Sequence, residues 1–113
     1  MVDKNYIPSK GDIVWLDFSP TRGHEQSNVR PALVLSNNRY NHKTGLMIVC
    51  AVTSQNKGYP YEVHMQGKKI EGVVLSDQIR SVAWKERKAS FVQKAQQSVI
   101  DEVEEKLATL LFV

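Results

Sequence analysis

An arginine followed by a proline, Arg30-Pro31, is the pair of residues whose types and position most clearly suggest chemistry. The apolar residues Ala32 to Leu35 follow and are typical of a buried strand. Proline cannot donate to a strand ladder, and it biases the residue before it toward an extended backbone. We therefore expect Pro31 to begin the strand and Arg30 to lie at its mouth. A guanidinium on a rigid element beside a polar loop is suited to binding an anion; the alternative is an ordinary surface charge.

Other groups capable of hydrogen bonding or proton transfer stand near predicted strand ends. Thr53-Ser54-Gln55 follows one apolar run, and Asp77-Gln78 follows another. His24 and Glu25 lie in the polar loop that precedes Arg30. Hydroxyl, carboxylate, imidazole and amide groups supply the donors and acceptors that catalysis requires. Whether these groups converge depends on the tertiary structure.

Few residues in the sequence support a metal centre or a covalent nucleophile. His24, His42 and His64 are scattered, and no Cys-x-x-Cys pair is present. No nucleophile-elbow pattern occurs. The single cysteine, Cys50, lies inside an apolar run and is expected to be a small buried residue. We expect neither a metal nor a cofactor.

Several short strands must position these groups. They are rich in β-branched and aromatic residues and are separated by turn residues. The long polar segment Ser19 to Val29 is predicted to be a loop, and such loops are often functional. The segment Asn37 to Gly45 is expected to contain a helical turn. The predicted strands cover Gly11 to Phe18, Ala32 to Leu35, Leu46 to Val52, Tyr61 to Met65, Gly72 to Leu75, Ile79 to Trp84 and Ala89 to Val92.

The last part of the chain changes from strand to helix periodicity. Ser98 followed by Asp101 resembles a capping box. Apolar residues then recur at helical spacing, and acidic residues occupy the opposite face. Many short strands followed by one terminal helix predict a mainly β fold, a small β-barrel. The apolar positions of the helix are Ile100, Val103, Leu107, Leu110 and Leu111.

Length and charge narrow the class of protein. A chain of 113 residues predicts a single domain over residues 1–113. No apolar stretch is long enough to cross a bilayer, and the N-terminus lacks a signal-peptide pattern, so we expect a cytoplasmic protein that does not bind membranes. The net charge is +3, but Gln96 to Val113 carries −3, which leaves +6 on the remainder. A basic body suits a polyanionic partner such as nucleic acid.

Six short motifs occur along the chain, namely Pro20-Thr21-x-Gly23-His24-Glu25-Gln26, Arg30-Pro31, Tyr40-Asn41, Val52-Thr53-Ser54, Lys57-Gly58-Tyr59-Pro60 and Asp77-Gln78. In this order, they resemble the MazF/PemK family of bacterial toxins. The resemblance spans nearly the whole chain and implies an SH3-like barrel closed by a C-terminal helix, the MazF/Kid/CcdB toxin fold. It further implies a homodimeric, sequence-specific, metal-independent endoribonuclease that cleaves single-stranded RNA and is neutralised by a cognate MazE-like antitoxin.

The same resemblance implies site residues. It assigns catalytic importance to Arg30 and Thr53, and the PemK/Kid branch adds matches to His24 and Asp77. That branch also has an arginine where this chain has Leu75, which favours the MazF-like reliance on Arg30 and Thr53.

The chemistry of metal-free RNA cleavage suggests a role for each of these residues. The 2′-hydroxyl of the substrate can act as nucleophile if a base accepts its proton and a cation stabilises the phosphoryl oxygens. Arg30 suits charge stabilisation because its fork matches a phosphate, whereas a guanidinium holds its proton too tightly for proton transfer. Thr53 is expected to donate or relay a hydrogen bond. His24 and Glu25 are the natural acid–base candidates, and Asp77 is either a base or an orienting group.

Base selection is expected to come from the loops. Single-stranded RNA is recognised by hydrogen bonds to base edges and by stacking on aromatic rings. The candidate RNA-binding residues are Lys57, Tyr59, Tyr61, Gln78, Ser54 and Gln55.

Two alternatives belong to other functional classes. One is a gyrase-poisoning toxin of the same fold, the CcdB group, whose activity resides in a tryptophan-containing tail; this chain ends Leu110-Leu111-Phe112-Val113. The other is an SH3-like binding module, which would not require Arg30 and Thr53 together.

Overall fold

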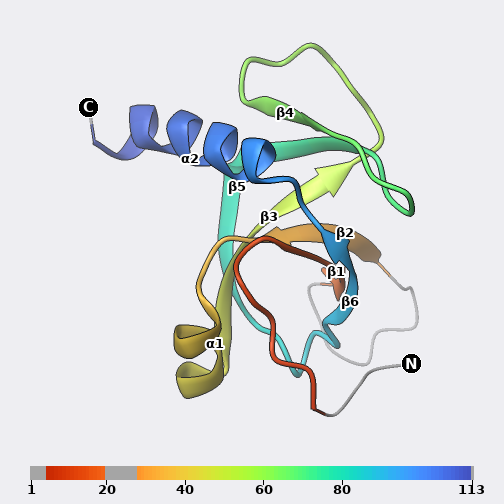
Figure 1. The fold of residues 1–113 in the computed structure, drawn as a ribbon, viewed down its shortest axis with the longest axis vertical. Coiled ribbons are helices and arrows are strands. Elements are labelled where there is room, and N and C mark those ends of the chain that lie inside the picture. The colour runs from red at the N-terminus through yellow and green to blue at the C-terminus, as the bar shows by residue number, and fades with distance from the viewer. Residues whose placement is uncertain (1–4, 20–27, 113) are drawn as a thin grey trace.

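The computed structural model describes residues 5–19 and 28–112. Its sheet has six strands in the order β4-β5-β3-β2-β1-β6, and every neighbouring pair is antiparallel. The sheet curls into an SH3-like half-barrel, and α2 lies against β4 and β5 (Figure 1). The predicted mainly β fold with a C-terminal helix is confirmed. The elements are β1 (Asp12–Asp17), β2 (Val29–Val34), α1 (Asn38–Thr44), β3 (Leu46–Thr53), β4 (Glu62–Met65), β5 (Gly72–Ala83), β6 (Ser90–Lys94) and α2 (Gln97–Leu111).

Both faces of the central strands are apolar because each face supports its own core cluster. In β1, Ile13 belongs to the cluster beneath α2, whereas Val14 belongs to the cluster on the other face. In β3, Cys50 belongs to the cluster beneath α2, and Val49 belongs to the cluster on the other face. Cys50 is fully buried, as expected, and burial followed by the charge of Asp77 raises the pKa of its thiol to about 12. These two-sided strands form a rigid base for the residues at their ends.

Both helices occur where the sequence predicts helical structure. In α1, the side chain of Asn37 accepts a hydrogen bond from the Tyr40 amide at 2.8 Å, and Gly45 ends the helix in the left-handed conformation. In α2, the apolar positions Ile100, Val103 and Leu107 are buried, as predicted. None of the described helices is both long and apolar enough to cross a membrane.

The predicted capping box at the start of α2 is wrong. The carbonyl of Gln96 already accepts hydrogen bonds from the amides of Val99 and Ile100, so the helix begins before Ser98. Ser98 therefore lies inside the first turn. Asp101 instead accepts a hydrogen bond from the Gln97 side chain at 2.9 Å.

The two strands predicted before and after Ser76-Asp77-Gln78 are one continuous strand, β5, of 12 residues. Ser76 does not end the strand, because its hydroxyl donates to the Tyr61 carbonyl at 2.5 Å and its amide donates to the same oxygen at 3.1 Å. Asp77 and Gln78 consequently lie in the middle of β5. A register shift between Cys50 and Val52 adjusts the pairing of β3 with this long strand.

The start of β2 also differs from the prediction. The strand begins at Val29, so Arg30 and Pro31 lie within it and pair with Leu16 and Trp15 of β1. Pairing with β3 starts only at Ala32. Pro31 is tolerated because this part of β2 has a strand on one side alone. Arg30 therefore lies within a strand rather than just before one.

Candidate active site

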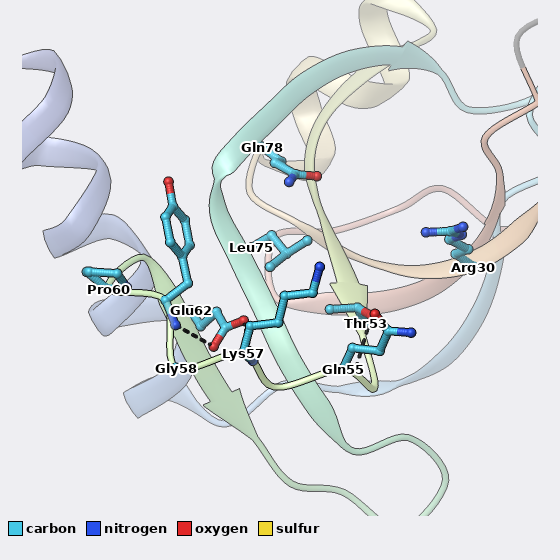
Figure 2. A pocket seen from close by; sticks show the side chains of 10 residues that line it. Arg30, Thr53, Gln55, Lys57, Gly58, Pro60, Glu62, Leu75 and Gln78 are labelled. Carbon is cyan, nitrogen blue, oxygen red and sulfur yellow. Dashed lines mark hydrogen bonds between the residues drawn. The ribbon is translucent and has the colours of Figure 1, made fainter.

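A cleft of about 580 Å³ opens where the ends of β2 and β3 face the loop of residues 54–61. Figure 2 shows Arg30 on one side of this cleft and Lys57 extending from the loop on the other. The structure therefore brings together six of the residues predicted from sequence, namely Arg30, Thr53, Gln55, Lys57, Tyr59 and Gln78. The remaining lining residues are Gly58, Pro60, Glu62 and Leu75.

Arg30 presents an oriented cation to the cleft. Its Nε donates a hydrogen bond to Oδ1 of Asn28 at 2.9 Å, which fixes the guanidinium plane. The side chain is exposed, and it makes no ion pair with any other residue of 5–19 and 28–112. Its two terminal nitrogens are therefore available for a bidentate contact with a phosphate.

Thr53 is the last residue of β3 and is held closely by its surroundings. Its Oγ1 accepts a hydrogen bond from the Gln55 amide at 3.2 Å, which leaves the hydroxyl proton free to be donated. Gly72 packs directly against the same residue, because a Cβ there would lie 2.3 Å from the Thr53 carbonyl oxygen. Only glycine permits this close approach, so the backbone of Thr53 is held in place at the cleft.

The loop of residues 54–61 is shaped by the carboxylate of Glu62. One oxygen accepts a hydrogen bond from the Lys57 amide at 3.1 Å, and the other accepts one from the Tyr59 amide, also at 3.1 Å. Glu62 is 8% exposed. Glu62 was not among the site residues predicted from sequence. The feature that could have indicated its role is its position directly after the loop, at the start of a strand in which apolar and polar residues alternate.

Asp77 also contacts this loop, through the side chain of Tyr59. Its Oδ2 accepts a hydrogen bond from the Tyr59 hydroxyl at 2.6 Å, and this bond raises the pKa of the Tyr59 phenol. Its Oδ1 is buried and has no hydrogen-bond partner among the described residues. Asp77 does not line the cleft itself. This placement suits an orienting role better than that of a base at the scissile phosphate.

The remaining predicted residues are not at the cleft or cannot be placed. The ring of Tyr61 lies 5.6 Å from that of Tyr59 and is tilted against it, so Tyr61 supports the loop. Ser54 lines a separate depression that also contains His64. His24 and Glu25 lie outside the described residues. Among the described residues, no cluster of histidine, cysteine, aspartate and glutamate could hold a metal ion.

Replacing Glu62 by glutamine is expected to destabilise the fold. The amide nitrogen of glutamine cannot accept a hydrogen bond, so one of the two loop amides would lose its partner, at a cost of about 1–3 kcal/mol. Urea unfolding should show a lower midpoint for Glu62→Gln, while the exposed Glu71→Gln serves as the matched control. Equal midpoints for both variants would show that the two loop hydrogen bonds do not stabilise the protein.

Comparison with known proteins identifies related sequences and structures. Residues 9–111 match the family described as PemK-like, MazF-like toxin of type II toxin-antitoxin system. The chain is 49% identical over 85 residues to the endoribonuclease toxin MazF of Escherichia coli K12, covering 75% of this chain and 77% of the relative. A crystal structure of MazF from Deinococcus radiodurans superposes with a TM-score of 0.87 at 48% identity, covering 96% of this chain and all of the other.

A MazE-MazF crystal structure from Deinococcus radiodurans matches with a TM-score of 0.88 at 49% identity, over 95% of this chain and 97% of that chain. The resemblance noted in the sequence is therefore confirmed by the family match, by a curated relative and by solved structures. The protein belongs to the family of PemK-like, MazF-like toxins of type II toxin-antitoxin systems.

Proposed function

We propose that this protein is an endoribonuclease toxin that cleaves single-stranded RNA, including mRNA, at specific sequences, and so inhibits translation and growth. One observation carries the proposal: Arg30 and Thr53, from neighbouring strands, face a single cleft whose other wall presents Lys57 and Tyr59. The E. coli relative is named an endoribonuclease toxin, which supports the same reading. A substrate of this kind places the protein in the cytoplasm.

The proposed reaction uses the 2′-hydroxyl of the substrate as nucleophile. Its oxygen forms a bond to the adjacent phosphorus, the bond from phosphorus to the 5′-oxygen breaks, and the products carry a 2′,3′-cyclic phosphate and a 5′-hydroxyl. Arg30 binds the phosphoryl oxygens as their charge increases. The Thr53 hydroxyl donates a hydrogen bond to the same phosphate. One protein group accepts the 2′-hydroxyl proton and another protonates the leaving oxygen; His24 and Glu25 are the proposed pair.

The far wall of the cleft is proposed to select the bases. Tyr59 has its hydroxyl engaged by Asp77, so its ring is fixed while remaining exposed for stacking. The Gln78 amide can read a base edge from β5, and Lys57 can contact a neighbouring phosphate. In this scheme Asp77 positions Tyr59 rather than transferring protons.

A cognate antitoxin is the proposed protein partner. The Deinococcus structures matched by this chain include complexes of MazE with MazF. We propose that an antitoxin of the MazE kind neutralises this protein.

Incubating the purified protein with a long RNA in the presence of a chelator tests the proposal. Discrete fragments with 5′-hydroxyl ends are expected. A gyrase poison or a peptide-binding module would leave the RNA intact. Mapping the fragment ends on a transcriptome-length RNA would define the recognised sequence.

We also predict that the protein forms a homodimer. The end of α2 leaves Leu111 61% exposed and Phe112 84% exposed, and Phe112 lines an apolar groove that includes Ile79 of β5. Contiguous exposed apolar surface of this kind often marks a protein–protein interface. Light scattering at micromolar concentration should give the mass of two chains, and Leu111→Glu should reduce it. A wild-type protein that remains monomeric under these conditions would contradict the prediction.

A further inference from the structure

A second depression continues the active-site cleft past Arg30. It has a volume of about 310 Å³ and shares Arg30 and Gln78 with the first cleft. The two therefore form one groove, with Lys57 on one side of Arg30 and the second depression on the other. Its other lining residues are Phe18, Asn28, Ala51, Ile79 and Arg80. Neither Phe18 nor Arg80 has a role in the function proposed above.

Arg80 is the distinctive residue of this depression. It lies on β5 opposite Val49, and its guanidinium carbon is 5.4 Å from the centre of the Phe18 ring. Cation–π contact at this distance holds a guanidinium in place without consuming its hydrogen-bond donors. Arg80 is exposed, and it makes no ion pair with any residue that the structure describes. The side chain is thus oriented, charged and available to a ligand.

The position of Arg80 matches that of Arg30 on the same face of the sheet. Arg80 is two residues from Gln78 along β5, and alternate residues of a strand share a face. Its partner Val49 belongs to the core cluster of that face, against which Phe18 also packs. Arg30 is likewise two residues from Ala32, a member of the same cluster. Two guanidinium groups therefore border one groove, each held by a different neighbour.

We propose that Arg80, supported by Phe18, is an RNA-binding residue that contacts a phosphate next to the scissile one, on the side of Arg30 away from Lys57. The inference rests on the proposed endoribonuclease function. A single strand running through the groove would meet Lys57, Arg30 and Arg80 in turn, and proteins that bind single strands commonly track the backbone with such a charged groove. Arg80 contributes to substrate affinity, whereas the chemical step depends on Arg30.

The test compares Arg80→Ala with wild type on an oligoribonucleotide that contains one mapped cleavage site. We expect KM to rise about tenfold while kcat stays within about twofold, because a contact remote from the reacting atoms affects binding. Binding can be measured with a substrate whose scissile nucleotide is 2′-deoxy. The slope of log affinity against log salt should be less steep for Arg80→Ala than for wild type by about 0.7, the value for one phosphate contact to a single strand. Arg80→Gln provides a second variant of similar size.

A truncation series locates the contact. The difference between Arg80→Ala and wild type should disappear once nucleotides are removed from one side of the cleavage site, and it should persist when they are removed from the other. Phe18→Leu keeps an apolar side chain but removes the ring, so we expect a smaller rise in KM. Arg39→Ala on α1 is the matched control, because Arg39 is exposed and lines neither part of the groove.

The possible outcomes separate the two proposals. If wild type leaves RNA uncut, the endoribonuclease proposal itself fails. If wild type cuts but both Arg80 variants behave like Arg39→Ala, the phosphate contact at Arg80 is refuted. A loss in kcat that persists on the shortest cleavable substrate would also overturn the inference, because it would place Arg80 at the scissile phosphate.

Discussion

Replacing Arg30 by alanine is expected to lower the rate of RNA cleavage by about 10²- to 10³-fold, the usual effect of removing one preorganised donor from a charged transition state. The physical reason is the fixed position of the guanidinium. It projects from β2 and is oriented by Asn28, so it can meet the developing charge without reorganising. The loss should appear in kcat measured by single-turnover cleavage.

The fold should survive this change. Arg30 is exposed and belongs to neither core cluster, so Arg30→Ala should unfold at nearly the same urea concentration as wild type. Arg30→Lys keeps the charge but loses the planar fork, and we expect an intermediate rate. Arg39→Ala again serves as the control for removal of an exposed arginine. If Arg30→Ala cuts within a few-fold of wild type while remaining folded, Arg30 has no catalytic role.

A substrate with a single 2′-deoxy sugar on the nucleotide upstream of the scissile bond is expected to resist cleavage completely. The deoxy sugar removes the attacking oxygen, whereas every phosphate and base that the groove contacts is unchanged. Internal attack already has the proximity that an enzyme must otherwise create for an external water. Binding should therefore persist, which fluorescence anisotropy can measure, while no fragments appear on a gel.

The same experiment tests independence from metal. Cleavage of the all-RNA substrate should be unchanged by chelator, and moving the 2′-deoxy sugar two positions away should restore cutting. The second substrate is the matched control, because it has the same length and number of phosphates. Efficient cleavage at the deoxy position, or activity that chelator abolishes, would overturn the proposed mechanism.

The stacked Arg80 and the loop bonds of Glu62 indicate how the two walls of the groove are kept in shape. On one wall, a buried carboxylate fixes the loop through two backbone amides. On the other, an aromatic ring supports a cation. Both arrangements limit the conformational freedom of residues proposed to contact RNA, which reduces the entropy lost on binding.

The sequence by itself determined the local structure of this protein. Short apolar runs separated by turn residues predicted most of the strands, since strand patterning depends on near neighbours. The apolar spacing of Ile100, Val103 and Leu107 likewise predicted α2. The linear order of motifs also indicated the family, and it identified Arg30 and Thr53, both of which line the cleft.

Only the tertiary structure decided how distant segments meet. Whether Ser76 interrupts a strand depended on the carbonyl of Tyr61, the residue just before the neighbouring strand β4. Glu62 has the residue type of a surface position, and its burial results from the loop that folds over it. The contact between Phe18 and Arg80 joins the residue that follows β1 to the interior of β5, two segments far apart in sequence. Such contacts arise from long-range pairing and sheet curvature, so the spacing of residues along the chain does not encode them directly.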